Sequence, residues 1–459
     1  MAPSASGEDT LQTAQRVLAL AGEDTQVTVI RERSLLSRFA RSAPTQATAV
    51  DDTTVEVLVV RDGHTAVAAT NRLDDDALRA TARRAEDAAL ASARSGPGLH
   101  PGLAQPAPVR NHSGFDVETA RLDPARAAAA LREVFAAAAE HGVEAFGVWT
   151  AGAVRTAIAS TTGLALDDEV TDTFMKVVCR DAGGRSGYAA GTAVAASALD
   201  AATLGRRAAA KVTGEPLAEL GPGIYPVVLE PEAVGLLLEF LGMLALNGLA
   251  HAEGRGALSG RIGTPVAAQG IDLADAPRSE RTLQRAFDFE GVPKASVALI
   301  QDGVAKGVVH DRRSAAVAGG AARSTGHAIA PGGSPWGPAP TNLVLAGGGA
   351  ADVAELTAPI ERGIYVTRLW YVNTVREKET LLTGMTRDGT FLVEDGEVTR
   401  PLRNVRFTDS VLRLLAATEA LTSAQRLVSE GEFYGRRFAQ GVVCPALRAG
   451  GFRVTGATE

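Results

Sequence analysis

An apolar run of eighteen residues, 233–250 (AVGLLLEFLGMLALNGLA), constrains the fold of this chain more than any other segment. Its length is marginal for crossing a bilayer of about 30 Å, and Glu239 near its middle would cost a few kcal/mol in lipid. The run therefore predicts a helix buried inside a folded protein, with no membrane partner. A carboxylate in such a helix must be paired, protonated or open to a cavity. Most such carboxylates form an ordinary ion pair or lie at a helix edge that reaches solvent.

Composition and charge indicate a folded protein and disfavour several functional classes. The chain has 459 residues, 46% of them hydrophobic and 22% charged, as expected for a folded protein of two to three domains. A net charge of −7 provides no positive field for nucleic acid or anionic lipid. The two cysteines lie far apart in sequence, which favours a reducing compartment over a disulfide framework. Residues 1–10 lack the basic and apolar regions of a signal peptide, so we expect a cytoplasmic protein.

The order of patterns predicts an α+β fold in three domains, at residues 1–95, 110–215 and 222–459. Pro- and Gly-rich stretches at 95–108 and 214–223 mark the boundaries. Both N-terminal segments combine helices with short strands in a meandering antiparallel sheet. The strands are expected at 26–31, 34–41, 53–60, 65–70, 144–150, 153–160, 164–171 and 173–180.

The C-terminal domain is predicted to be rich in hairpins around the buried apolar helix. Asp302-Gly303, Asp388-Gly389 and Asp395-Gly396 are each flanked by strand-forming residues, and Asp-Gly pairs favour tight two-residue turns. Strands and helices are clustered rather than strictly alternating, which argues against a doubly wound parallel sheet.

Motifs for common catalytic sites are absent or incomplete. None of the seven histidines forms an i, i+4 pair, so no single helix presents two imidazoles to a metal. His251-Ala252-Glu253 resembles the H-x-E of zinc deaminases but lacks the accompanying C-x-x-C. Gly347-Gly348-Gly349 precedes Asp352, which fits a helix N-cap better than a dinucleotide-binding turn.

Four C-terminal segments carry a family resemblance through their joint order. They read FDFEGVPKASVALIQDGVAKGVVHD (287–311), RSTGHA (323–328), GIYV (363–366) and FLVEDGEVTRPLRNV (391–405), and Arg38-Phe39-Ala40 adds a match near the N-terminus. With them the chain resembles the TldD/TldE family, also called PmbA or modulator of DNA gyrase. The resemblance covers nearly the whole chain and implies a TldD/PmbA-like fold.

The resemblance also implies the chemistry of the chain. TldD-type subunits are zinc peptidases with H-E-x-x-x-H on a buried helix and a cysteine ligand near the C-terminus, and TldE-type subunits lack these ligands. On this chain the motif falls on Leu238, Glu239 and Met243, so only the glutamate is kept. Leucine offers no lone pair and a lone thioether is a poor zinc ligand. Cys444 lies a few residues past the expected ligand position, near 438–441, and is interpreted as a buried strand residue.

The expected protein is thus a TldE-like subunit without catalytic residues and without its own metal. Zinc is expected in a TldD-like partner, with which the chain would form a heterodimer, and a homodimer stays open when the partner is absent. The expected substrate is an extended peptide, which can add to a sheet edge through main-chain hydrogen bonds. Candidate contacts lie in two segments, at Ser324, Thr325, Gly326, His327, Thr383 and Gly384.

Two other functions remain open at this stage. The chain could hydrolyse peptides itself, with Glu239 as general base and ligands from His251, His310 or His327, provided that these histidines converge in space. Alternatively it could be an adaptor that binds gyrase or another protein without hydrolysis. Its acidic charge would direct such a role through protein contacts rather than DNA.

Overall fold

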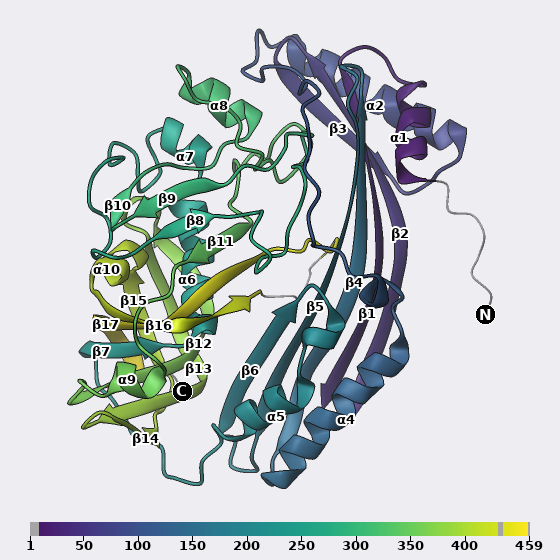
Figure 1. Ribbon diagram of the computed structural model, residues 1–459. Coiled ribbons are helices and arrows are strands. Elements are labelled where there is room, and N and C mark those ends of the chain that lie inside the picture. The colour runs from purple at the N-terminus through teal and green to yellow at the C-terminus, as the bar shows by residue number, and fades with distance from the viewer. Residues whose placement is uncertain (1–8, 430–434, 458–459) are drawn as a thin grey trace.

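A computed structural model describes residues 9–429 and 435–457 (Figure 1). Residues 1–8, which carry most of the segment used to argue against a signal peptide, lie outside the described residues. The helices are α1 (Thr10–Leu18), α2 (Asp75–Ala93), α3 (Val117–Ala120), α4 (Pro124–Glu140), η1 (Ala196–Ala198), α5 (Ala201–Ala209), α6 (Pro231–Leu244), α7 (Gly248–Ala252), α8 (Arg312–Ala318), α9 (Val353–Thr357), η2 (Glu377–Glu379) and α10 (Val411–Ala416).

The strands confirm the predicted α+β class. They are β1 (Thr25–Ala40), β2 (Ala43–Arg61), β3 (His64–Thr70), β4 (Glu144–Ser160), β5 (Ala165–Arg180), β6 (Ser186–Ala193), β7 (Gly223–Leu229), β8 (Leu273–Asp275), β9 (Val297–Gln301), β10 (Val304–Ala305), β11 (Asn342–Leu345), β12 (Arg362–Arg376), β13 (Leu381–Glu394), β14 (Glu397–Pro401), β15 (Val405–Ser410), β16 (Thr418–Val428) and β17 (Gly441–Ala457).

The N-terminal half forms one long, curved antiparallel sheet with the strand order β3-β2-β1-β4-β5-β6 (Figure 1). Because β1 pairs with β4, strands from residues 1–95 and from 110–215 belong to the same sheet. The domain boundaries themselves stay predictions. The sheet is antiparallel, as the sequence predicts, and it continues across the predicted boundary at residues 95–108.

The alternation of side chains between the two faces of each strand explains what packs on each face of this sheet. In β1, Val27 and Val29 pack with α1 and α2, and Leu35 and Phe39 pack with α4 and α5. Ile30 points to the other face, where it packs with residues of the C-terminal half. Since successive strand side chains point to opposite faces, the helices cover one face and the C-terminal half faces the other (Figure 1).

The predicted strand lengths are wrong in a consistent way. The runs expected at 144–150 and 153–160 form the single strand β4, and those at 164–171 and 173–180 form β5. Likewise the runs at 26–31 and 34–41 join in β1. Between the predicted ranges the neighbouring strands continue to pair, and this pairing satisfies the backbone groups there.

The C-terminal half is a mixed sheet of 11 strands, part of which closes on itself. Strands β17, β15, β13, β12 and β7 form a closed ring, because β7 pairs with both β12 and β17. The Asp302-Gly303 and Asp395-Gly396 pairs are hairpin turns as predicted. Asp388-Gly389 is not a turn: both residues lie within β13 opposite Thr367, as a bulge with positive φ.

The apolar run is split between α6 and α7, and α6 lies in the largest apolar core. Across residues 9–429 and 435–457, no helix has the length and apolar character needed to span a membrane. Asp9, Asp74, Asp123 and Asp200 cap α1, α2, α4 and α5 through their carboxylates, which accept hydrogen bonds from N–H groups of the first turn.

A buried arginine joins the C-terminal half to the N-terminal sheet. Arg437, 2% exposed, lies across β4 at Gly152 and forms a bidentate pair with Asp172, at 2.7 Å from Nε and 2.7 Å from Nη2. Its Nη1 donates to Thr150 Oγ1 at 2.9 Å, and its backbone N–H donates to Glu32 at 2.8 Å. We call this set the arginine junction. It holds the chain that leads into β17.

Candidate functional site

One stripe of α6 remains partly open while the rest of the helix is buried. Leu236, Glu239, Phe240 and Met243 recur at helical spacing, and Met243 is 51% exposed. Leu238 lies on the other side, 0% exposed within the apolar core. The open stripe is therefore the face of α6 that can meet a ligand.

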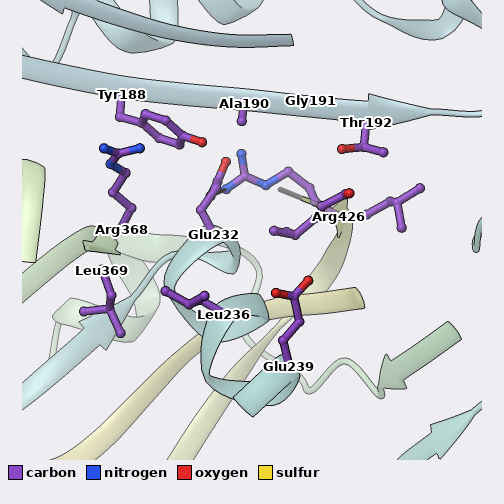
Figure 2. Close-up of a pocket in the computed structure, with 13 residues that line it drawn as sticks. Tyr188, Ala190, Gly191, Thr192, Glu232, Leu236, Glu239, Arg368, Leu369 and Arg426 are labelled. Atoms are coloured by element: carbon purple, nitrogen blue, oxygen red, sulfur yellow. Dashed lines mark hydrogen bonds and ion pairs between the residues drawn. The ribbon is translucent and has the colours of Figure 1, made fainter. Parts of the chain in front are cut away.

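A small cavity of about 30 Å³ lies above the first half of this stripe (Figure 2). It separates α6 from β6, the edge strand of the N-terminal sheet, and Glu239 points toward it. Four charged side chains line it, the acids Glu232 and Glu239 and the bases Arg368 and Arg426. The remaining lining residues are Tyr188, Ala190, Gly191, Thr192, Leu236, Leu369, Leu427, Val428 and Ser429.

A larger groove of about 590 Å³ lies above the second half of the stripe. Glu239 lines both the groove and the small cavity, so it stands where the two meet. The groove walls come from the end of α6, the 336–343 loop, the end of β12 and the start of β17. Its other lining residues are Gly242, Met243, Leu244, Asn247, Arg255, Ile329, Trp336, Gly337, Pro338, Ala339, Pro340, Thr341, Leu343, Thr374, Glu377, Phe438, Gln440, Gly441 and Val442.

Two glycines of α6 set how closely the neighbouring elements approach. A Cβ on Gly235 would lie 2.9 Å from Val428 of β16, and one on Gly242 would lie 2.9 Å from Pro340. Both contacts are closer than real Cβ atoms allow, so these walls depend on glycine at these positions.

Buried charges gather at the first turn of α6, in what we call the glutamate junction. Glu230 and Glu232 are 4% and 8% exposed. Lys211 Nζ lies 2.5 Å from Glu230, and Arg426 Nη2 lies 3.3 Å from Glu230 and 3.1 Å from Glu232. Arg207 is 3.5 Å from Glu232, and Tyr365 donates its hydroxyl to Glu230. Lys211 and Arg207 belong to the N-terminal half, so this cluster also joins the two halves.

Burial, and after it the neighbouring Glu230 carboxylate, raise the pKa of Glu232 to about 7 against the pull of Lys211 and Arg207. Cys444, 0% exposed in β17, approaches Pro231 O at 3.3 Å. Burial and the two carboxylates Glu232 and Glu239 raise the pKa of its thiol well above the usual value. The sequence-based interpretation of Cys444 as a buried strand residue is confirmed.

The spacing of the H-E-x-x-x-H motif occurs in two frames on α6, each with one glutamate. In the frame considered from sequence, Leu238 is in the core and lines neither space, so the structure does not bring it together with Glu239 and Met243. In the other frame, Pro231 and Leu236 hold the histidine positions around Glu232. Glu232 and Leu236 line the same cavity. Sequence reasoning missed this second frame, although the Glu-Pro-Glu sequence at the helix start could have indicated it.

Neither frame provides a donor set that suits zinc. Each has a single carboxylate and no imidazole or thiolate at the histidine positions, whereas zinc sites in proteins take three or four such ligands. Within residues 9–429 and 435–457, no group of three or more His, Cys, Asp or Glu side chains could hold a metal ion. The described residues of α6 at the two motif frames therefore do not fit the zinc ion that the resemblance implies.

The histidines that the alternative hypothesis of hydrolysis by this chain requires do not line the small cavity or the groove. His327 is 1% exposed and places Nε2 at 2.9 Å from Asp275, while His310 Nδ1 lies 3.2 Å from Ser314 Oγ. Among the described lining residues of the small cavity and the groove there is no histidine. The structure thus does not bring His251, His310 or His327 to Glu239.

The six candidate peptide contacts also lie outside the groove and the small cavity. Ser324 and Thr325 donate to His310 O at 3.3 and 3.1 Å, and Gly326 adopts φ +77° with Pro293 O directly against it. His327 lines a separate small cavity with Lys294 and Asp288. Thr383 donates to Phe407 O at 3.0 Å within β13, and Gly384 is buried beside it. Their role in peptide binding stays a prediction.

Comparison with known proteins identifies the family. The family model of the PmbA/TldA metallopeptidase C-terminal domain matches residues 222–456, and that of PmbA/TldA metallopeptidase domain 1 matches residues 26–89. Curated relatives include a metalloprotease of Methanothermobacter thermautotrophicus, 28% identical over 236 residues, which are 50% of this chain and 49% of the relative. A metalloprotease of Synechocystis is 30% identical over 206 residues, 43% of this chain and 42% of the relative. The chain thus spans about half the length of the curated relatives it matches.

Solved structures show the same fold over almost the whole chain. TldE from Thermococcus kodakarensis matches with a TM-score of 0.83 at 18% identity, over 96% of this chain and 99% of that one. A Thermotoga maritima protein described as a modulator of DNA gyrase matches with a TM-score of 0.79 at 20% identity, over 97% of this chain and 99% of that one. With a family model matched over more than half of its length, this chain belongs to the PmbA/TldD metallopeptidase family.

Proposed function

We propose that this chain is a non-catalytic, TldE-like subunit of a cytoplasmic TldD/TldE-type metallopeptidase complex that cleaves unfolded or precursor peptides. The proposal rests on the residues that α6 carries at the positions of the family motif. Both frames of the family motif keep a glutamate there, and their histidine positions hold Leu238 and Met243 or Pro231 and Leu236. A glutamate alone can accept a proton, but it cannot bind zinc tightly or polarise a peptide carbonyl.

The proposed role of the chain is to hold peptide for a catalytic partner. The groove is large enough for several residues of an extended chain and is mostly apolar, which suits peptides in an unfolded state. The proposed partner is a TldD-like subunit that supplies zinc and the intact H-E-x-x-x-H helix. Exposed apolar side chains at the groove and on the nearby end of β12, namely Met243, Trp336, Tyr371 and Val375, support a partner-facing surface in this region.

The test compares the chain alone with the chain beside a partner. The purified chain is incubated with equimolar zinc, dialysed and analysed for metal, and its hydrolysis of an unstructured peptide is followed by mass spectrometry. We expect far less than one zinc per chain and no cleavage. Co-expression with a TldD-like chain from the same genome should give a co-purifying complex that cleaves the peptide.

The matched control is the same complex with the motif glutamate of the partner changed to Gln, which should assemble and remain inactive. Stoichiometric zinc in the isolated chain would overturn the proposal. So would cleavage by the isolated chain that Glu239→Gln abolishes, because this result would assign hydrolysis to the chain itself.

A further inference from the structure

The cavity that His327 lines together with Lys294 and Asp288 lies between the two halves of the molecule and has a volume of about 20 Å³. Strands β4 and β5 line it from the N-terminal sheet, and Arg285 and Lys294 line it from the C-terminal half. We call it the donor cavity, after the N–H groups of these two bases. A space of this size holds one small polar group.

The two bases of the donor cavity carry more N–H groups than the surrounding protein engages. Arg285 and Lys294 are 8% and 5% exposed. Arg285 Nε donates to Ala439 O at 3.4 Å, and its Nη2 is buried without a hydrogen-bond partner within residues 9–429 and 435–457. Lys294 has three N–H groups, one of which donates to Thr341 Oγ1 at 2.6 Å. Neither base forms an ion pair with a carboxylate in the described part of the chain.

The two acids that line the cavity are already engaged by other groups. Asp168 lies 2.7 Å from His112 Nε2 and accepts from the Ala286 N–H at 3.0 Å. Asp288 accepts three backbone N–H groups, at 2.9, 3.0 and 2.9 Å. Burial, and after it the Glu290 carboxylate, raise the pKa of Asp288 to about 7. The unused capacity of the cavity is therefore on its donors, which suits a ligand that accepts hydrogen bonds.

Burial makes both bases gain from an anion beside them. It lowers the pKa of Arg285 to about 10, so this group stays charged at pH 7. It also lowers the pKa of Lys294, against the opposing effect of Asp275 and Asp288. Asp275 is itself paired with His327 at 2.9 Å. Because a buried cation is costly unless it is paired and hydrogen-bonded, a carboxylate between the two bases would stabilise both.

The donor cavity adjoins the groove, since Thr341 and Phe438 line both spaces. Thr341 Oγ1 accepts the hydrogen bond of Lys294, and Arg285 Cζ lies 4.2 Å from the centre of the Phe438 ring. Both bases thus lie directly behind the groove wall. The donor cavity has room for one small group and none for a further length of chain, so a peptide that reaches it from the groove must end there.

We propose that the donor cavity binds the C-terminal carboxylate of a peptide held in the groove, with Arg285 and Lys294 as its donors. This inference rests on the proposed function and specifies the substrate class, which is extended peptides with a free carboxyl end. Main-chain contacts along an extended peptide give affinity with little regard to sequence. The carboxylate would therefore fix the direction in which the peptide lies and the position of its last residue.

The experiment measures binding of peptides to the full chain by fluorescence anisotropy. Three octapeptides share one unstructured apolar sequence and the same N-terminal label. The first ends in a free carboxylate, the second in a carboxamide, and the third in a carboxamide after a final Asp, whose side chain supplies the carboxylate. We expect the first peptide to bind about tenfold more tightly than the second, because hydrogen bonds to charged groups are among the strongest in proteins. The third should bind like the second.

Equal binding of the free acid and the carboxamide would overturn this inference and leave the proposed function standing. Binding of the Asp peptide as tightly as the free acid would also overturn it, because the cavity would then take acidic side chains. Absence of binding by all three peptides would count against peptide holding itself, and so against the proposed function.

A matched pair of variants locates the effect. Lys294→Met keeps the length of the side chain and removes its charge, so the free acid should lose its advantage while the carboxamide keeps its wild-type affinity. Lys306→Met, at an exposed lysine that lines neither space, should preserve the advantage. An advantage that survives Lys294→Met would overturn the assigned site. Should this variant not fold, the wild-type protein supplies a second measurement: N-acetylleucine should displace the free-acid peptide, and N-acetylleucinamide should not. Equal displacement by the two compounds would overturn the inference.

Discussion

The arginine junction and the glutamate junction connect the same two halves of the molecule with different arrangements of buried charge. At the first, one arginine meets one buried carboxylate in a bidentate pair, and Thr150 and Glu32 satisfy further donors of the same residue. At the second, Glu230 and Glu232 lie side by side and need three bases and a tyrosine around them. The first is a fixed geometric link, whereas the second holds a group that titrates near neutral pH beside the small cavity.

This difference shows how one interface can separate two tasks. A closed ion pair with directional hydrogen bonds positions the chain that enters β17 and thereby one wall of the groove. A pair of like charges costs stability, and such costs persist in proteins mainly where a site needs them. If the two junctions differ in this way, changes at the arginine junction should have the largest effects on stability and changes at the glutamate junction the smaller ones.

The largest effect is expected from Arg437→Ala. Removal of the base leaves Asp172, 2% exposed, without its counter-charge, and such losses cost about 3–5 kcal/mol. The free energy of unfolding in urea at pH 7 measures this change. As control, Arg400→Ala removes a pair at 3.5 Å with side chains 52% and 35% exposed, and should change stability by less than about 1 kcal/mol. Similar losses of unfolding free energy in both variants would contradict the view that the buried pair stabilises the protein more than the exposed pair.

Gly152→Ala should destabilise by about 1–3 kcal/mol through crowding. The added Cβ would lie 2.5 Å from Arg437 Nε, too close for either group to remain in place. In an Arg437→Ala background the same change should cost much less, because the crowding atoms are gone. A double-mutant cycle measures this coupling. Gly349→Ala, where nothing lies within 4 Å of the new Cβ, is the control, and additive effects of Gly152→Ala and Arg437→Ala would refute the contact.

The glutamate junction should make stability depend on pH. The pKa of Glu232 rises from 4.5 to about 7 on folding, so the folded state binds this proton more tightly than the unfolded state. Its contribution to the free energy of unfolding therefore falls as pH rises from about 4.5 to about 7. Glu232→Gln cannot titrate, so relative to wild type it should gain of the order of 1–2 kcal/mol between pH 5 and pH 8. Parallel pH profiles of the two proteins would contradict this assignment.

The smallest effect is expected from Tyr365→Phe. The hydroxyl donates to Glu230 in a buried setting, and its loss should cost about 1 kcal/mol. Denaturation curves at pH 7 measure this change. An unchanged free energy of unfolding would contradict the assigned hydrogen bond.

Local signals in the sequence were enough for helix starts and true hairpins. Asp74 and Asp123 cap their helices because an aspartate before a helical pattern satisfies free N–H groups next to it in sequence. Asp395-Gly396 and Asp388-Gly389 look alike locally, yet the first is a turn and the second a bulge opposite Thr367. Only the register with β12 separates them, and register depends on strands remote in sequence.

The site was predictable only in part for the same reason. Glu239 stood out because it interrupts an apolar helix, and the structure places it at the meeting point of the cavity and the groove. The glutamate junction was missed because Lys211, Tyr365 and Arg426 reach it from three separate elements. Gly152 lies between the predicted strands 144–150 and 153–160, and in the structure it is the point within β4 where Arg437 crosses the strand.

The exposure of Trp336 gives the molecule its own optical reporter. Of the three tryptophans, Trp149 is 3% exposed within the sheet and Trp370 has the guanidinium groups of Arg368 and Arg387 over its ring. Trp336, 81% exposed on the groove wall, should dominate the red side of the emission spectrum and the quenching by iodide. Any molecule that enters the groove should shift that emission to the blue and shield it from the quencher, so occupancy can be followed without a label.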